Sequence, residues 1–541
     1  MLISRTPNRL YFFVLACLLA ALACSRSNGP LDYSHITPLP GFGPGTPAPD
    51  GAPAEAPGAP TATLVPASPP VAGVPSATPR PTIDISLPPT PDHTRPSPLD
   101  RQTVEHYTVQ RNDTLSEIGE RYGVSAAQIA AANGIQVADT LFTGQVLLIP
   151  LPEGQPVGPD LKILPDSEFV HGPGAVGFNL EGFIQSQRGY LASYSEDVPN
   201  TYLDGASGST TLAGVEIIQW VAEHYSLSPR VLLAVLEYQA GWVTQARPRD
   251  NTLTYPLRHV EAGREGLYRQ LTWAARQLNF GYYAWRANAL VSLSFADGSI
   301  KVIAPGLNAG TVGLQHYFSK VLHPDDWARA MSHDGFVLTY RALFGNRFAF
   351  AWEPLTPPDL VQPPLQLPFE SGKVWAFTGG PHGAWDSGSA WAALDFAPPA
   401  EAEGCTPSDE WVAAAAPGLI VRAEYGSVLE DLDGDGYEGT GWTLFYMHVE
   451  ARDRVEAGTR VEAGDRLGHP SCEGGVSNGA HVHLARKYNG EWIPADGPIP
   501  FVLDGWVSVG LGKEYDGKLV YDEIEIEACD CRAAGNEISR P

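Results

Sequence analysis

The spacing of apolar and polar side chains marks two long regions of different structure. Residues 165–352 carry apolar positions at helical spacing: after Ser228, an N-cap followed by proline, the apolar residues from Val231 to Leu236 form one helix face. Residues 371–512 instead have short apolar runs separated by Gly, Asp and Pro, which is typical of antiparallel strands. We therefore predict a multidomain α+β chain, in which a mostly helical middle region precedes an antiparallel β-sheet domain.

The remaining segments of residues 165–541 are two further helices, a joint and a tail. Glu265–Leu278 and Asp326–Ala342 are predicted as helices of the middle region on the same periodicity. A Pro-rich joint at residues 353–370 separates the helical region from the β region. Residues 513–541 follow the β region as a C-terminal tail, to which the sequence assigns no role.

The first 23 residues have the pattern of an export signal. Two arginines precede the apolar run LYFFVLACLLAALA, and small residues precede Cys24. This run is too short to span a bilayer comfortably. The ending ALAC resembles the lipobox of bacterial lipoproteins, which implies cleavage before Cys24 and a lipid anchor on that cysteine. Ala21 stands where the lipobox usually has Leu, so ordinary signal cleavage is the alternative.

Composition predicts a stalk after the signal and limits the partners of the chain. Residues 24–103 consist mainly of Pro, Ala, Gly, Ser and Thr, so they cannot bury enough apolar surface to offset the entropy of ordering and are predicted to be disordered. The net charge of −26 argues against nucleic-acid binding, which needs a basic face. We expect everything after the signal to lie outside the cytoplasm.

Residues 104–151 show the order strand, helix, helix, strand. Tyr107–Gln110 predicts the first strand, Ser125 and Gln128 form a capping box for the second helix, and GQVLLIP predicts the second strand. With YTV, DTLSEIGERYGV and AANGI, this segment resembles the LysM module. The resemblance implies binding to N-acetylglucosamine chains of peptidoglycan or chitin. A small stable domain with an unused groove is the alternative.

One motif in the helical region resembles the lytic transglycosylases. It lies at residues 229–241, and Asn308–Gly310 is similar to a second segment of that family. However, Gln239 stands where the family has its catalytic Glu, and an amide cannot protonate a leaving oxygen. We therefore predict a lysozyme-like fold that holds glycan or acts as a helical spacer. Glycan cleavage through Glu237 is the lesser alternative.

The β region contains four histidines and an acid that could form a metal site. In GAHVHLAR, His481 and His483 lie two positions apart, so on a strand they project from one face. His382, Asp395 and His448 lie in other predicted strands or turns. Three nitrogen or carboxylate ligands with an open position for water are what a catalytic zinc needs.

These residues resemble the motifs of the lysostaphin-type and beta-lytic, staphylolysin-like, zinc endopeptidases that cut peptidoglycan cross-bridges. Thirteen positions separate His382 from Asp395, as in the beta-lytic branch with its inserted loop. Asp386 lies four positions after His382, the spacing of the more common form, but the strand AALDFA matches the ligand strand better. The resemblance implies that His382, Asp395 and His483 hold one zinc ion, with water as the fourth ligand.

The same resemblance assigns a role to the remaining two histidines. His448 matches the histidine of the family's Tyr-x-His motif, and His481 matches the first histidine of its final His-x-His pair. The resemblance implies that both are catalytic: one takes a proton from the attacking water and the other stabilises the charge that develops on the substrate.

Disulfides and a second metal are further predictions for the β region. Because the chain is predicted to be exported, we expect disulfides among its four later cysteines. Cys405 with Cys472 is a candidate pair, the Cys-Asp-Cys pair near the end forms a small ring or stays unpaired, and the connectivity is left open. Asp431, Asp433 and Asp435 alternate as in a calcium loop, although Trp442 replaces its final Glu. A solvated acidic turn is the alternative.

Together these features predict an exported, lipid-anchored protein that faces the cell wall. Its predicted activity is zinc-dependent hydrolysis of peptide bonds in peptidoglycan stem peptides or cross-bridges. Its partners are then peptidoglycan and, through the anchor, the membrane. The alternatives are a non-catalytic peptidoglycan-binding scaffold or regulator, and a lytic transglycosylase acting through the helical region.

Overall fold

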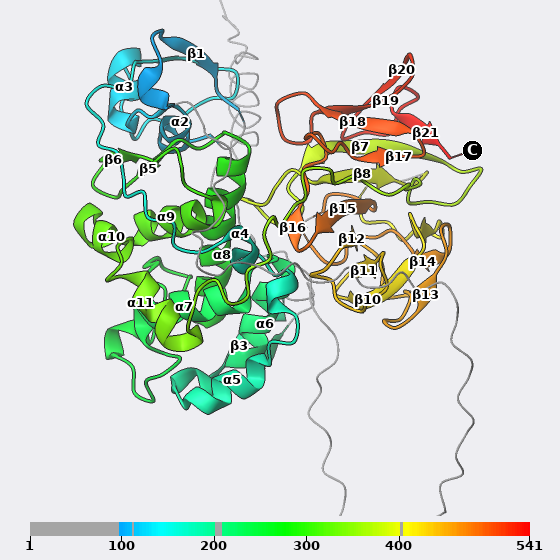
Figure 1. The fold of residues 1–541 in the computed structure, drawn as a ribbon. Helices are drawn as coiled ribbons and strands as arrows, with labels where there is room; N and C mark the ends of the chain where they lie inside the picture. The colour runs from blue at the N-terminus through cyan, green and yellow to red at the C-terminus, as the bar shows by residue number, and fades with distance from the viewer. Residues whose placement is uncertain (1–96, 111–112, 201–207, 401–403, 476, 541) are drawn as a thin grey trace, which may run out of the picture.

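The computed structural model describes residues 97–540, except 111–112, 201–207, 401–403 and 476. In Figure 1 a small N-terminal module lies at one end of a helical region, and the β region lies beside both. The predicted export signal, the anchor at Cys24 and nearly all of the predicted stalk lie outside the described residues. Within the described residues no helix is long and apolar enough to span a bilayer.

The N-terminal module has the predicted order of elements, and local capping explains where its helices begin and end. Ser125 and Gln128 form the predicted capping box of the second helix, and Thr114 with Glu117 forms another for the first. The two strands pair antiparallel. In chain order the elements are β1 (Glu105–Thr108), α2 (Leu115–Tyr122), α3 (Ala126–Asn133) and β2 (Val146–Ile149), preceded by the short η1 (Pro98–Asp100).

A buried carboxylate docks this module on the helical region. Glu120 of α2 accepts hydrogen bonds from Ser294 N at 2.7 Å and Ser294 Oγ at 2.6 Å. It also pairs with Lys320. Because Glu120 is 1% exposed, removal of these partners would leave a buried charge uncompensated. The module is therefore fixed to its neighbour.

The helical region is built around two long helices, α8 and α9. They approach so closely that a Cβ on Gly281 would lie 2.9 Å from the Gly313 Cα. The helices are α4 (Asp166–Phe169), α5 (Leu180–Gln187), α6 (Gly214–His224), α7 (Pro229–Ala240), α8 (Leu267–Arg286), α9 (Ala309–Val321), α10 (Pro324–Ala330) and α11 (Phe336–Phe344). Shorter elements are η2 (Pro173–Ala175), η3 (Tyr190–Ser193), η5 (Asp250–Thr252) and the hairpins β3 (Ser195–Pro199) with β4 (Ser209–Ala213) and β5 (Ser292–Ser294) with β6 (Ile300–Val302).

Two helix predictions in this region differ from the structure. The helix predicted over Glu265–Leu278 extends to Arg286. The single helix predicted over Asp326–Ala342 is wrong, because α10 ends and α11 begins within it. The break lies at Gly335, where a Cβ would be 2.3 Å from the Ala330 carbonyl oxygen. Only glycine allows the chain to turn back so tightly, and apolar periodicity does not detect that turn.

Within the described residues, nine strands of the β region form one antiparallel sheet with the order β13-β10-β11-β12-β15-β8-β7-β21, and β16 pairs with β15. A second sheet has the order β17-β18-β19-β20, and β14 pairs with β9. The strands are β7 (Val374–His382), β8 (Ala393–Ala397), β9 (Val412–Ala413), β10 (Gly418–Glu424), β11 (Ser427–Asp431), β12 (Trp442–Met447), β13 (Arg460–Val461), β14 (Arg466–Gly468), β15 (Val482–Tyr488), β16 (Glu491–Trp492), β17 (Val502–Leu503), β18 (Trp506–Gly510), β19 (Gly517–Tyr521), β20 (Ile524–Glu527) and β21 (Glu537–Ser539).

Both faces of the large sheet are covered, and the two faces belong to different cores. On β12, Leu444 and Tyr446 pack into the core within the β region. Phe445 and Met447, which point to the opposite face, pack into the core shared with the helical region. The helical region therefore covers one face of the sheet, as the side-by-side arrangement in Figure 1 indicates.

The C-terminal residues are part of this fold, so the predicted boundary of the β domain at residue 512 is wrong. Strands β19 and β20 extend the small sheet, and β21 pairs with β7 in the large one. The joint at residues 353–370 also contributes Leu367 and Phe369 to the core of the β region. Edge pairing between distant segments carries no local sequence signal, which explains the error.

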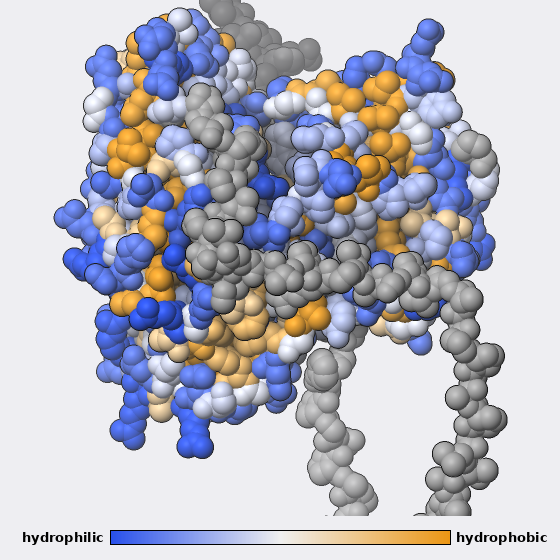
Figure 2. All heavy atoms as spheres, viewed as in Figure 1, coloured by the Kyte–Doolittle hydropathy of each residue, from blue (hydrophilic) through white to orange (hydrophobic). Residues whose placement is uncertain are grey.

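Both candidate cysteine pairs are disulfide-bonded in the described part of the chain. Cys405 pairs with Cys472 at an S–S distance of 1.99 Å, and Cys529 pairs with Cys531. Figure 2 shows polar residues over most of the visible face, with apolar residues in scattered patches between them.

A buried acid inside the sheet makes the stability of the chain depend on pH. Glu430 on β11 is fully buried and accepts a hydrogen bond of 2.6 Å from the Tyr446 hydroxyl. Burial raises the pKa of Glu430 to about 8. In the unfolded chain the same acid ionises near its ordinary value of about 4.3, so the folded chain becomes less stable as pH rises between these two values.

We therefore expect Glu430→Gln, which keeps the acceptor for Tyr446, to gain stability over the native chain as pH rises from 5 to 8. The gain should approach about 1.4 kcal/mol per pH unit and level off above the folded pKa. Denaturant unfolding at several pH values measures the difference. If the free energy of unfolding changed with pH in the same way in both chains, the assignment of Glu430 as a buried neutral acid would be contradicted.

Candidate metal centre

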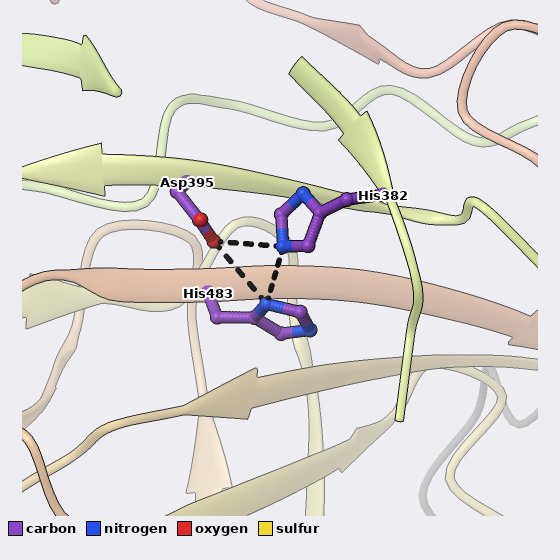
Figure 3. A group of neighbouring side chains, drawn as sticks. All are labelled: His382, Asp395 and His483. Atoms are coloured by element: carbon purple, nitrogen blue, oxygen red, sulfur yellow. Dashed lines mark hydrogen bonds and ion pairs between the residues drawn. The ribbon is translucent and has the colours of Figure 1, made fainter. Parts of the chain in front are cut away.

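The strands of the large sheet bring the predicted ligands together. His483 on β15 is paired directly with Asp395 on β8, and β8 pairs in turn with β7, which ends at His382. His483 and Asp395 lie on the sheet face that packs toward the helical region, because Ala485 and Ala393, two positions away on the same strands, join that core. Figure 3 shows the three side chains pointing toward one another.

The three side chains form a compact triangle of ligand atoms. His382 Nε2 lies 2.9 Å from His483 Nδ1, and Asp395 Oδ1 lies 3.2 Å from each of these nitrogens. All three residues are buried: His382 is 2% exposed, His483 4% and Asp395 7%. Zinc with ligands at about 2.0–2.1 Å in tetrahedral geometry places them roughly 3.3 Å apart, so the triangle has the size of such a site.

Backbone carbonyls determine which ring nitrogens face the centre of the triangle. His382 Nδ1 donates to the Gly380 carbonyl at 2.8 Å, and His483 Nε2 donates to the Ala384 carbonyl at 3.0 Å. The nitrogen that carries the proton is therefore the one that points away. The lone pairs of His382 Nε2 and His483 Nδ1 remain for a metal, as in metal sites generally.

Charge also favours a cation here. Asp395 Oδ1 is buried and has no hydrogen-bond donor among the described residues. Burial alone would raise the pKa of Asp395, but its interactions with the His382 and His481 rings hold that pKa well below its ordinary value, so the acid is ionised. A buried carboxylate without a donor fits a divalent metal, which satisfies its charge.

The other two predicted histidines lie next to the triangle. The rings of His448 and His481 are 4.4 Å apart, and His481 Nε2 lies 3.7 Å from Asp395 Oδ1. His448 Nδ1 donates to the Glu473 carbonyl, and His481 Nδ1 donates to the Gly479 carbonyl, each at 2.8 Å. Their Nε2 atoms are thus left for chemistry. The structure brings all five predicted residues together.

Two neighbours of the triangle were not predicted from the sequence. Tyr515 stacks on His382 with ring centroids 4.2 Å apart. Gly379 faces Asp395 so closely that a Cβ there would lie 2.6 Å from Asp395 Oδ2. Tyr515 lies in the segment that we assigned to a tail, and no motif marks it.

Asp386, the alternative ligand, is not part of the triangle. Its carboxylate accepts a hydrogen bond of 2.7 Å from the Tyr225 hydroxyl and pairs with Arg276 Nε at 2.7 Å. Both partners belong to the helical region. The geometry therefore favours Asp395 over Asp386 as the acid of the metal site.

The acidic loop after β11 has a structural explanation without calcium. Oxygen atoms of Asp431, Asp433 and Asp435 lie within 4.8 Å of one another. The buried Asp431 carboxylate, however, already accepts backbone N–H bonds from Asp433, Gly434 and Gly436. These bonds are those of an acidic turn between strands.

Glu237, the candidate catalytic acid of the helical region, already accepts several hydrogen bonds. Glu237 accepts backbone hydrogen bonds from Val243 at 2.9 Å and Thr244 at 3.1 Å, just beyond the end of α7. Gln239 is buried and donates to the Tyr317 hydroxyl at 3.3 Å. Glu237 therefore holds the turn after α7, a structural role that differs from glycan cleavage.

Two family models and a curated relative match parts of the chain. Residues 162–358 match the model of the LasA N-terminal domain, and residues 107–150 match the LysM domain. Protease LasA of Pseudomonas aeruginosa strain UCBPP-PA14 is 26% identical over 357 residues, which cover 62% of this chain and 75% of that protein. Over these residues the chain is similar to a protease, and it contains a segment that matches the LysM domain.

Other similar proteins cover shorter parts of the chain. N-acetylmuramoyl-L-alanine amidase XlyA of Bacillus subtilis strain 168 is 32% identical over 119 residues, 21% of this chain and 39% of that protein. The deep-sea M23 metalloprotease pseudoalterin is 24% identical, covering 31% of this chain and 96% of that structure, with a TM-score of 0.26. The lysostaphin catalytic domain from Staphylococcus simulans is 23% identical, covering 22% and 87%, with a TM-score of 0.17.

We expect His382→Ala and His483→Ala to lose zinc. Each change removes a ligand nitrogen, and changes that only misorient ligands already cost about 10- to 100-fold in affinity. Metal content after dialysis measures the loss. His469→Ala is a matched control: His469 is buried and donates to the Glu410 carbonyl, but it lies outside the triangle. Zinc retained at native stoichiometry in both ligand variants would contradict the assignment.

Proposed function

We propose that the chain hydrolyses peptide bonds in the stem peptides or cross-bridges of peptidoglycan, with one zinc ion held by His382, Asp395 and His483. The observation that carries this proposal is the buried triangle of ligand atoms, with separations of 2.9 and 3.2 Å, beside two further histidines. A structural zinc site would have a fourth protein ligand, whereas three ligands leave room for water and substrate.

The roles that we propose for His448 and His481 follow from their hydrogen bonds. When bound, zinc would polarise the scissile carbonyl and lower the pKa of water. His448 and His481 keep Nε2 available because their Nδ1–H groups are held by carbonyls. Burial, followed by the nearby His481 and His483, holds the pKa of His448 well below its ordinary value. One of the two histidines accepts the proton of the attacking water at Nε2, and the other donates to the developing oxyanion as an imidazolium, with a proton on both ring nitrogens.

We also propose where the enzyme works. The LysM module would bind the glycan strands and so raise the local concentration of peptide substrate. The export signal and Cys24 would place the chain outside the cytoplasm on a lipid anchor, facing the cell wall, with the stalk between anchor and enzyme. The helical region would hold glycan or act as a spacer, and calcium at Asp431, Asp433 and Asp435 remains a prediction.

Two other functions make different predictions. A non-catalytic scaffold would bind peptidoglycan without degrading it and would not need His448 and His481 beside the triangle, where both lie. A glycan-cleaving enzyme would use Glu237, whose carboxylate is occupied by the turn after α7. Both observations favour peptide cleavage at the metal site.

We expect the zinc-loaded full chain to reduce the turbidity of a peptidoglycan suspension and to release new amino termini. His448→Ala and His481→Ala should each slow cleavage by about 10²–10⁴-fold, the usual contribution of a general acid or base, while zinc stays bound. Glu237→Gln serves as the control and should cleave at the native rate. New reducing ends or anhydro-sugars in place of amino termini would refute the proposal.

The LysM module offers a separate test through two exposed apolar side chains. Val137 and Phe142, on the loop between α3 and β2, are 54% and 70% exposed. We expect Val137→Ser combined with Phe142→Ser to weaken binding to insoluble peptidoglycan at least about tenfold, since burial of even one such side chain is worth roughly 1.5–3 kcal/mol. Co-sedimentation measures this. Val361→Ser, at a 77% exposed valine outside the module, should bind normally; equal losses would contradict the proposal.

A further inference from the structure

The segment between the ligands His382 and Asp395 is held by the helical region. Trp385 lies between the two regions, with its ring centroid 4.9 Å from that of His224 on α6 and 6.0 Å from that of Phe445 on the sheet. Gly388 fits so tightly that a Cβ there would lie 2.7 Å from the Arg276 carbonyl oxygen on α8. The loop inserted between the ligands therefore sits in the interface between regions.

Polar contacts on Asp386 fix this segment in place. The carboxylate accepts a hydrogen bond from the Tyr225 hydroxyl and pairs with Arg276 Nε, each at 2.7 Å. The side chain of Asp386 is 3% exposed, so both contacts are shielded from water. Asp386 also has a φ of 55°, in the left-handed region that residues other than glycine rarely adopt.

The same segment touches the metal triangle through its backbone. The Ala384 carbonyl accepts the Nε2–H of His483 at 3.0 Å. Bonds inside the segment join this carbonyl to Asp386: Trp385 N donates to Ser389 Oγ at 3.1 Å, and Ser389 Oγ donates to the Asp386 carbonyl at 3.0 Å. Ala384 N also donates to the Ala390 carbonyl at 3.0 Å. These bonds therefore connect Asp386, which lies at the interface, to the Ala384 carbonyl, which holds His483.

We propose that Tyr225 and Arg276 of the helical region are positioning residues for the metal site, acting through Asp386 and the Ala384 carbonyl on His483. They hold the acceptor that keeps the proton on Nε2 and turns Nδ1 toward the metal. The helical region is then part of the metal-binding structure in addition to covering the sheet. This inference rests on the proposed function only in taking zinc as the ion.

Loss of these contacts should weaken metal binding without removing a ligand. When the segment relaxes, the Ala384 carbonyl shifts and His483 loses the hydrogen bond that selects its tautomer and ring orientation. Partners that orient metal-ligating histidines typically contribute about 10- to 100-fold in metal affinity. If the contact only held the two regions together, its loss would lower overall stability and leave metal affinity unchanged.

A matched pair of arginines on α8 separates these two roles. Arg276 pairs with Asp386 at 2.7 Å, and Arg286 pairs with the buried Glu491 at 2.7 Å. Both pairs cross from the helical region to the β region. Glu491 lies on β16, outside the segment between the ligands. Arg286→Gln therefore disturbs the same interface with similar chemistry but leaves Asp386 untouched.

The experiment uses the full chain after removal of metal by a chelator. Zinc affinity is measured by competition with a chromophoric chelator, and ligand geometry is followed by the visible spectrum of the Co²⁺-substituted chain. We expect Arg276→Gln and Tyr225→Phe to weaken zinc binding about tenfold or more and to change the Co²⁺ spectrum. Arg286→Gln should stay within about twofold of the native affinity, with the native spectrum.

Several outcomes would overturn the inference. Native zinc affinity in both Arg276→Gln and Tyr225→Phe, or an equal loss in Arg286→Gln, would show that the contact does not position the ligand. Faster peptidoglycan cleavage by Arg276→Gln or Tyr225→Phe, with unchanged zinc affinity, would show that the contact with Asp386 obstructs substrate instead. A native chain that binds zinc yet cleaves no peptidoglycan would overturn the proposed function alone, because affinity and spectrum are measured without substrate.

Discussion

The site depends on hydrogen bonds between backbone carbonyls and histidine rings. In His382, His448, His481 and His483, one ring N–H is held by a carbonyl oxygen at 2.8 to 3.0 Å. Each bond selects the tautomer and aims the opposite nitrogen at a common centre. Without them the rings could rotate or shift their proton to the other nitrogen, and proximity alone would not create a metal site. The sheet supplies the positions, and the carbonyls determine which atoms face inward.

The sequence identified the parts of this protein that local chemistry specifies. The capping box at Ser125 and Gln128 predicted where α3 begins, and the structure has it there. The His-x-His spacing on a strand predicted that His481 and His483 share a face, and the structure places both beside Asp395. These patterns are recognisable because each depends on neighbours only a few positions away or on a family motif.

Contacts between distant segments could not be predicted in this way. The stacking of Tyr515 on His382 and the bonds of Asp386 with Tyr225 and Arg276 join segments more than 100 residues apart. The break at Gly335 depends on the approach of the Ala330 carbonyl, which periodicity does not register. The sequence therefore predicted which side chains lie together, and the structure was needed to find what orients and surrounds them.

The pairing of β21 with β7 has a consequence for the order in which the fold is completed. Strand β7 ends at His382, yet one of its two neighbours is contributed by Glu537–Ser539, more than 150 positions later. A chain synthesised in N- to C-terminal order therefore has an unpaired edge on β7 until residues 537–539 are made. Closure of that edge, at Val374–Ala376, is then one of the last steps in completing the large sheet.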